Sequence, residues 1–248
     1  MDVTHHHASE LATAGVTIVR SAVPAAVAAS AAAAKRYFEE QTRRTVGDIL
    51  RFPEGAEVIH QLATGICARI AQAYLSSESA VTRTWIPEMS LVTRRFLVPA
   101  APGDVLPYHQ DSYSLPALFT SVNCWVLLYP SDTERAAGLE FVMSNLDRSL
   151  PPEPDPQHPT KKWLEPARVS VQAEIDRGGT WRPRIGLGDV AMFSPYILHR
   201  TAAEAALEPR IAIQCRFVGV TPFVVETYRE NGQRLFEADG DHLRTVTL

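Results

Sequence analysis

Residues 188–201 read GDVAMFSPYILHRT, and this stretch decides the fold class. A Gly-Asp turn signal opens it, a short apolar run follows over residues 189–193, and His199 stands at the far end. A short apolar run between turn residues is typical of a buried strand. We therefore expect an apolar strand that carries a histidine at its far end.

Similar short runs occupy the chain from Met89 onward, at residues 90–98, 119–129, 139–143, 167–175 and 210–220. Ahead of them, Ser21 is placed to cap an Ala-rich helix over residues 21–41. Apolar pairs recur every four residues over 53–75, which predicts an amphipathic helix. Two helices followed by many short strands predict a mainly β fold with flanking helices, an antiparallel sandwich or barrel with the helices on one face.

One domain over residues 1–248 accounts for this pattern, with N-terminal helices at about 20–76 and a β core at about 89–220. Residues 150–163, LPPEPDPQHPTKKW, hold five prolines in their first ten positions and show no periodicity. A long irregular segment inside a compact domain is often functional. We expect a lid-like loop at about 147–163.

Composition narrows the class of protein. Lys and Arg number 24 against 28 Asp and Glu, a net charge of −4, which opposes binding to nucleic acid. The apolar run at 24–34 is too short to span a bilayer and has no basic leader, so we expect no signal peptide and no membrane partner. Cys67, Cys124 and Cys215 are odd in number and lie in apolar stretches, which predicts buried free thiols and a cytoplasmic location.

Two further residues pair with His199 as metal ligands. His109 and Asp111 are two positions apart, so on a strand they would point to the same face and reach one ion together. His199 follows 88 residues after Asp111 and supplies a third ligand. Two histidines and one carboxylate on one side of an ion form the facial triad of non-haem Fe(II) oxygenases.

Arg210 lies 11 residues after His199 and opens an apolar strand. A turn over residues 202–209 would bring that strand back beside the one that carries His199. The planar guanidinium would then lie a few residues from the metal, where it fits a carboxylate with two hydrogen bonds.

With Arg210 included, the sequence resembles the phytanoyl-CoA dioxygenase-like family of Fe(II)/2-oxoglutarate-dependent dioxygenases over residues 91–220. The likeness rests on the H-x-D at 109–111, the G-D-x-x-x-F-x-x-x-x-x-H-x-T run at 188–201 and the Arg at 210. It implies a double-stranded β-helix core, of the jelly-roll or cupin-like type. It also implies Fe(II) on His109, Asp111 and His199.

By the same resemblance, 2-oxoglutarate would chelate the iron and place its distal carboxylate on Arg210 and Thr201. Trp125 would line the co-substrate pocket. The activity implied is O2-dependent hydroxylation of a C–H bond, with release of succinate and CO2. Asp111 favours hydroxylation over halogenation, because related halogenases lack this carboxylate, and desaturation or ring closure would use the same ligands.

Strand alternation extends the candidate site without the family. If Arg210 faces inward, Gln214 and Arg216 do too, and Asn123 shares a face with Trp125. Asn123 becomes a candidate contact for 2-oxoglutarate or substrate. The candidate substrate contacts are Tyr113 on a strand continuing from Asp111, Gln214, Arg216 and Arg95, where either Arg94 or Arg95 points inward.

Competing hypotheses stay open at this stage. A jelly-roll module that binds a metal or small ligand without turnover would use the same ligands, and so would a Zn²⁺ hydrolase, although the hydrolase gives no reason for Arg210. Nucleic-acid repair dioxygenases carry the motif R-x-N-x-T-x-R. Arg210 and Arg216 match its two ends, but Ala212 and Gln214 stand where the motif has Asn and Thr. We favour a free small-molecule substrate over a carrier-bound thioester. The sequence leaves the oligomeric state open.

Overall fold

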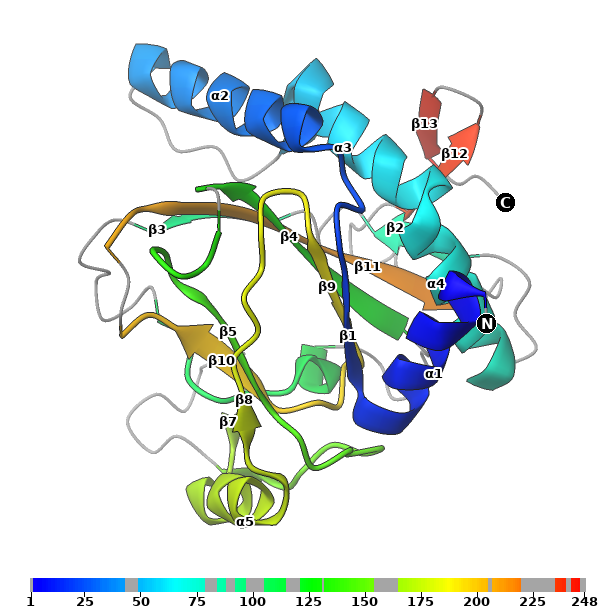
Figure 1. Cartoon of the computed structure of the whole chain (residues 1–248), viewed down its shortest axis with the longest axis vertical. Helices are drawn as coiled ribbons and strands as arrows, with labels where there is room; N and C mark the ends of the chain where they lie inside the picture. The colour runs from blue at the N-terminus through cyan, green and yellow to red at the C-terminus, as the bar shows by residue number, and fades with distance from the viewer. Residues whose placement is uncertain are drawn as a thin grey trace.

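The computed structural model shows antiparallel sheets with most of the helices packed on one side (Figure 1). It describes residues 2–42, 49–78, 84–87, 92–96, 105–114, 121–130, 132–153, 165–204, 207–219, 235–239 and 242–245. The helices are α1 (Val3–Ala14), α2 (Ala25–Thr42), α3 (Pro53–Thr64), α4 (Ile66–Glu78) and α5 (Arg168–Gly178), with 3-10 turns η1 (Ile49–Arg51) and η4 (Asp111–Ser114). The strands are β1 (Val16–Val19), β2 (Thr84–Pro87), β3 (Val92–Phe96), β4 (Ser121–Tyr129), β5 (Gly138–Val142), β6 (Pro152–Glu153), β7 (Glu165–Pro166), β8 (Thr180–Trp181), β9 (Val190–Phe193), β10 (His199–Ala202), β11 (Arg210–Gly219), β12 (Leu235–Asp239) and β13 (His242–Thr245).

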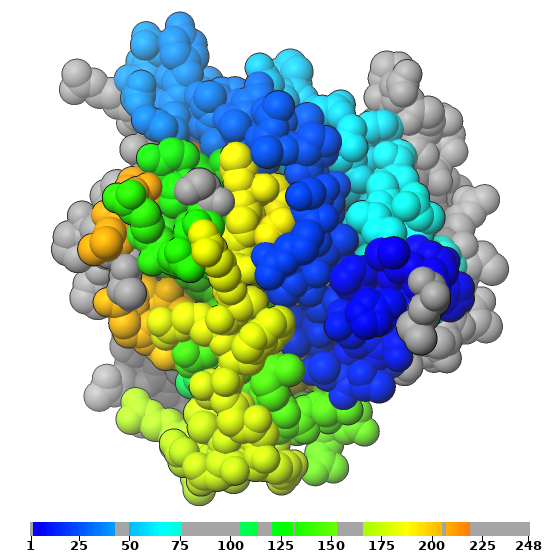
Figure 2. Space-filling view, viewed as in Figure 1, coloured from blue at the N-terminus to red at the C-terminus, as the bar shows by residue number. Residues whose placement is uncertain are grey.

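The described strands form a large sheet, a small sheet and a separate two-stranded sheet, and the pairings between these named strands are antiparallel. The large sheet has the order β1-β9-β4-β11-β2-β12-β13, with β3 also paired to β11. The small sheet has the order β10-β5-β8, and β6 pairs with β7 separately. Helices α2, α3 and α4 cover the large sheet on the side away from the small sheet (Figure 1). In the space-filling view these helices, blue and cyan, cover one side of the molecule, and α5 lies at the opposite end (Figure 2).

Side chains alternate between two cores along β4 and β11. Cys124 and Ile213 belong to the core between the large sheet and the helices, whereas Trp125 and Ala212 belong to the core between the two sheets. The register pairs Trp125 with Gln214, and directly opposed residues share a face. The predicted orientation of these two strands is therefore confirmed.

The amphipathic helix predicted over 53–75 is two helices that break at Gly65. The Gly65 backbone is extended, at φ −83° and ψ −158°, and its N–H donates to the Gln61 carbonyl oxygen at 2.9 Å. A Cβ at this position would lie 2.4 Å from that oxygen. The apolar pattern runs through the break because α3 and α4 bury the same kind of face against the large sheet.

The strand predicted over 167–175 is wrong, since α5 occupies this segment. Val169 and Val171 alternate with polar residues as in a strand, but Val169 is exposed. Val171 and Ile175, four residues apart, both pack on the small core beside Val142. A spacing of four residues belongs to one face of a helix, so the short apparent alternation was misleading.

The Gly188-Asp189 pair ties the N-terminal segment to the large sheet. Gly188 has φ +77°, and a Cβ there would lie 2.1 Å from the Val23 carbonyl oxygen. Asp189 Oδ1 accepts a hydrogen bond from the Ser21 N–H at 2.8 Å, and Oδ2 accepts from Arg20 Nη1 at 2.6 Å. Ser21 therefore hydrogen-bonds to Asp189. The helix α2 begins at Ala25, after Pro24, so the predicted helix cap at Ser21 is wrong.

The three cysteines are buried free thiols, as predicted. Although far apart in sequence, Cys124 and Cys215 are directly opposite each other in the β4–β11 register. Among the described helices, none combines the length and the apolar character that crossing a membrane requires.

Candidate metal centre

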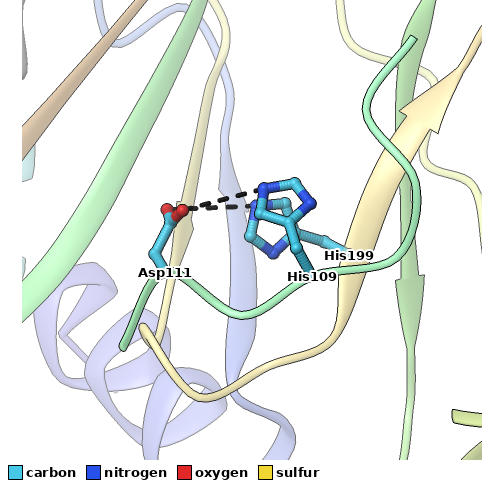
Figure 3. Close-up of side chains that lie close together, drawn as sticks. All are labelled: His109, Asp111 and His199. Atoms are coloured by element: carbon cyan, nitrogen blue, oxygen red, sulfur yellow. Dashed lines mark ion pairs between the residues drawn. The ribbon is translucent and has the colours of Figure 1, made fainter. Parts of the chain in front are cut away.

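Three metal-ligating side chains meet between the two sheets (Figure 3). Asp111 Oδ1 lies 3.7 Å from His109 Nε2, and Asp111 Oδ2 lies 3.9 Å from His199 Nε2. One ligand atom from each residue falls within 4.8 Å of the other two. Asp111 and His199 are buried, and His109 is nearly so. This donor set fits a divalent transition metal on one face and leaves other coordination positions open.

Both imidazoles present the same nitrogen to the centre. His109 Nδ1 lies 2.8 Å from the Pro107 carbonyl oxygen, and His199 Nδ1 lies 3.1 Å from the Ile197 carbonyl oxygen. A proton donated to these carbonyls resides on Nδ1 and leaves the Nε2 lone pair for a metal. Burial, together with the neighbouring His109, lowers the pKa of His199 to about 4. The ring is therefore neutral at physiological pH, as metal ligation requires.

A bridge between a loop and a strand brings the two histidines together. The N–H groups of His109 and His199 each donate to the other residue's carbonyl oxygen, at 3.0 and 3.1 Å. The strand expected to continue through Tyr113 is absent, because Asp111 begins the turn η4. Tyr113 instead donates its hydroxyl to the Leu150 carbonyl oxygen at 2.5 Å. Its expected place on the ligand face was wrong.

The neighbours of the distal ligand also differ from the expectation. His199 does not end the strand that starts at the Gly-Asp turn, since β9 stops at Phe193 and His199 opens β10 in the other sheet. Pro195, which lacks the N–H that a strand would use, lies in the intervening turn. The strand of Arg210 pairs with β4 and β3 rather than with β10. Arg210 and His199 therefore line one cavity from opposite sheets.

Gln110, which the sequence analysis did not select, braces the loop between the two ligands. Its Nε2 donates to the Tyr196 carbonyl oxygen and, at 3.1 Å, to the Arg148 carbonyl oxygen. Its Oε1 accepts from the Leu150 N–H at 2.7 Å. The side chain is buried, and all three of these hydrogen bonds go to backbone groups of other segments.

Asp111 is held by polar groups from β11 and stays ionised. Gln214 Nε2 donates to Asp111 Oδ2 at 2.9 Å, and Arg216 Nη2 lies 3.5 Å from the same oxygen. Burial alone would raise the pKa of Asp111, but the charge of Arg216 and the two imidazoles outweigh it and lower the pKa below its usual value. The carboxylate is thus the charged form that binds a cation.

A cavity connects the histidine pair to Arg210. Its lining comprises Leu106, His109, Trp125, Leu139, Phe193, His199, Arg200, Thr201, Arg210, Ala212 and Gln214. Arg210 is buried, its Nη1 donates to the Ala137 carbonyl oxygen at 2.8 Å, and its guanidinium carbon lies 5.1 Å from the centre of the Trp125 ring. A buried guanidinium facing a metal site along one cavity suits the far carboxylate of a short dicarboxylate.

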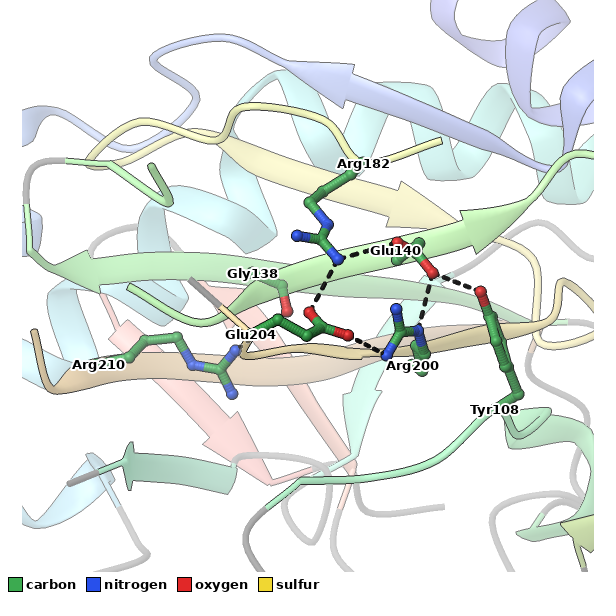
Figure 4. Close-up of polar contacts among 7 residues, drawn as sticks. All are labelled: Tyr108, Gly138, Glu140, Arg182, Arg200, Glu204 and Arg210. Atoms are coloured by element: carbon green, nitrogen blue, oxygen red, sulfur yellow. Dashed lines mark hydrogen bonds and ion pairs between the residues drawn. The ribbon is translucent and has the colours of Figure 1, made fainter. Parts of the chain in front are cut away.

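On the outer face of the small sheet, a charged network fixes the residues next to both histidines (Figure 4). Glu140 accepts from the Tyr108 hydroxyl, from Arg200 Nε at 2.8 Å and from Arg182 Nη2 at 3.1 Å. Arg200 and Arg182 also donate to Glu204. Tyr108 precedes one histidine ligand and Arg200 follows the other, so this network, which the sequence did not reveal, supports the loop and the strand that carry them.

The remaining predicted residues fall partly outside the described structure. Arg95 lies on β3, whose register places Arg94 opposite Ala212 and Arg95 opposite Ile211. The choice between Arg94 and Arg95 as the inward-pointing residue stays a prediction. Of the lid-like loop at 147–163, residues 154–163 lie outside the described residues.

Comparisons with known proteins place the fold. No protein-family model and no curated protein sequence matches the chain. Among solved structures, it is similar to the non-haem alpha-ketoglutarate-dependent epimerase SnoN from nogalamycin biosynthesis, with a TM-score of 0.62, 17% identity, and 88% of this chain and 84% of SnoN covered. It is also similar to the alpha-ketoglutarate-dependent carbocyclase SnoK from the same biosynthesis, with a TM-score of 0.62, 15% identity, and coverage of 98% and 96%.

A further similar structure is EvdO2 from Micromonospora carbonacea var. aurantiaca complexed with 2-oxoglutarate, with a TM-score of 0.56, 14% identity, and coverage of 89% and 92%. These identities are low, so the likeness concerns the path of the chain. The protein therefore has the fold of non-haem, 2-oxoglutarate-dependent enzymes, and its own His-Asp-His cluster lies between the two sheets of that fold.

Proposed function

We propose that this protein is a non-haem Fe(II)/2-oxoglutarate-dependent oxygenase with a double-stranded β-helix core, from the phytanoyl-CoA dioxygenase-like branch. The observation that carries the proposal is the single cavity lined by both histidine ligands and by the buried Arg210. A metal site alone fits several classes of protein. A buried guanidinium across the cavity from it adds a place for a second carboxylate, which 2-oxoglutarate has and a simple metal-binding module does not need.

His109, Asp111 and His199 would hold Fe(II). When bound, the iron with 2-oxoglutarate supplies the activation of O2 for attack on a C–H bond. The residues of this chain bind and orient the co-substrate: Arg210 receives its distal carboxylate, Thr201 lines the cavity beside it, and Trp125 stacks over the Arg210 guanidinium.

The proposed reaction is hydroxylation of a free small molecule, in which one C–H bond becomes C–OH while 2-oxoglutarate and O2 become succinate and CO2. Support for a small-molecule substrate comes from the neighbours, one of which was solved with nogalamycin RO. The neighbours include an alpha-ketoglutarate-dependent epimerase and an alpha-ketoglutarate-dependent carbocyclase, so enzymes with this fold carry out more than one kind of reaction. Asp111 favours hydroxylation over halogenation.

The same proposal treats the chain as one domain over 1–248 with a lid-like loop at about 147–163, working in the cytoplasm. The buried free thiols support a reducing compartment.

A binding module without turnover is the second candidate, since the metal ligands alone would serve it. The test is succinate release from 2-oxoglutarate by purified protein with Fe(II), in air and under argon. We expect O2-dependent succinate formation in wild type and its loss in His199→Ala. Tight metal binding without O2-dependent succinate, across a panel of small-molecule substrates, would favour the binding module.

A further inference from the structure

Gln214 and Arg216, which were candidate substrate contacts from the sequence, both reach the same oxygen of a metal ligand. Gln214 Nε2 donates to Asp111 Oδ2 at 2.9 Å, and Arg216 Nη2 lies 3.5 Å from that oxygen. Both side chains come from the inner face of β11 at positions two apart, so one strand delivers both. The other carboxylate oxygen, Oδ1, lies 3.7 Å from His109 Nε2, and Oδ2 itself lies 3.9 Å from His199 Nε2, so each oxygen faces one histidine ligand.

We propose that Gln214 and Arg216 form a clamp that holds Asp111 Oδ2 and so fixes the carboxylate between the two histidine ligands. This inference rests on the proposed function and adds two positioning residues to it. A carboxylate that is already held in place does not have to be ordered when a metal binds, so the clamp should raise the affinity for the metal.

Arg216 is itself fixed by a third residue, Asn123. Arg216 Nε donates to Asn123 Oδ1 at 2.8 Å, and the register sets these two residues directly opposite each other on β11 and β4. Asn123 is fully buried. A guanidinium has several donors in one rigid plane, so it can hold Asn123 through Nε and face Asp111 through Nη2 at once. Lysine has one nitrogen and cannot span both partners.

The clamp explains the contacts better than substrate binding does. Gln214 lines the cavity, but its amide is already engaged by the buried carboxylate of Asp111, whereas a side chain that waits for substrate keeps its polar end free. The groups around a ligand set its orientation and basicity, and their loss typically weakens metal binding about 10–100-fold. A substrate contact would leave metal affinity unchanged.

The test compares metal binding by Gln214→Met and Arg216→Met with wild type, using full-length protein and Co(II) as the probe. Methionine keeps much of the length and volume of glutamine without its donor. Gln172→Met is the matched control, because Gln172 Nε2 donates to Asp176 Oδ1 at 2.7 Å on the exposed helix α5. Gln214→Asn serves as a second variant, since it keeps the amide but withdraws it by one methylene group.

We expect about 10–100-fold weaker Co(II) affinity in Gln214→Met and Arg216→Met. We also expect an altered visible Co(II) spectrum in these two variants, with Gln172→Met unchanged. Wild-type metal affinity and spectra in folded Gln214 and Arg216 variants would overturn the clamp, while 2-oxoglutarate binding by wild type would leave the proposed function intact. If wild type binds metal but not 2-oxoglutarate, the proposed function fails and the metal affinities of the variants still decide the clamp. Wild type without metal binding would overturn both.

Discussion

Replacing Gln110 by methionine tests whether the loop between two metal ligands depends on one buried amide. Gln110 donates to the carbonyl oxygens of Tyr196 and Arg148 and accepts from the Leu150 N–H. Methionine has similar length but makes none of these three hydrogen bonds. Each bond contributes about 1 kcal/mol net to stability, so the substitution should lower the free energy of unfolding by about 3 kcal/mol.

The assay is thermal unfolding of the metal-free protein followed by circular dichroism. For a domain of this size, 1 kcal/mol corresponds to roughly 2–4 °C in Tm, so Gln110→Met should unfold about 6–12 °C below wild type. Added metal stabilises whichever form binds it. Because Gln110 holds the loop of His109 and Asp111, the rise in Tm on adding Co(II) should be smaller in the variant.

Gln172→Met on the exposed face of α5 is the control and should leave Tm close to wild type. A Gln110→Met protein with the Tm of that control, and with the wild-type response to Co(II), would refute the bracing role.

Three other predictions concern the frame of the site. Gly188→Ala should lower Tm more than Gly179→Ala, because both glycines have positive φ but only the Cβ at 188 would meet a backbone atom, 2.1 Å away; thermal unfolding of the two variants decides it. For Glu140, burial raises the pKa but the hydrogen bonds from Arg200 and Tyr108 hold it below its usual 4.5. Its stabilising effect is therefore present above pH 4.5 and lost as the pH falls through the lower folded pKa, so the Tm values of wild type and Glu140→Gln should converge on acidification, and a constant gap would contradict this. Burial raises the pKa of Cys67 and Cys124, so the three thiols should react with a thiol reagent only after unfolding, and labelling of native protein would disprove it.

Much of the site could be predicted because its residues combine spacing and chemistry. His109, Asp111 and His199 have few roles other than metal ligation when they occur in this order with an arginine after them, and the structure brings the three together. The sequence also predicted which residues of β4 and β11 face the cavity, because side chains alternate between the two cores along both strands. Long runs of one period leave little ambiguity.

The wrong predictions concern short segments whose sequence fits more than one local structure. The alternation at Val169 and Val171 is only a few residues long. A helix forms here because it places Val171 and Ile175 on one face, where both pack against the core. The change of sheet between Phe193 and His199 depends on a turn whose geometry local sequence does not specify. That change also decides that Arg210 reaches the cavity from the sheet opposite His199.

Long-range polar partners were the other gap. The bonds of Gln214 to Asp111 and of Arg216 to Asn123 join residues 103 and 93 positions apart. Sequence spacing indicates which face such residues occupy but not what they touch there. The helix α1, with its cap at Asp2, was also missed, because its residues lack a strong apolar stripe.

The central claim is that one cavity holds both a metal on His109, Asp111 and His199 and a dicarboxylate on Arg210. Its most direct test is anaerobic addition of Fe(II) and 2-oxoglutarate, with the weak visible charge-transfer band of the chelate as the readout. We predict the band in wild type, its loss in His199→Ala and Asp111→Ala, and a need for much higher 2-oxoglutarate in Arg210→Ala. Wild-type protein that binds Fe(II) yet shows no band, or Arg210→Ala that needs no more 2-oxoglutarate than wild type, would contradict it.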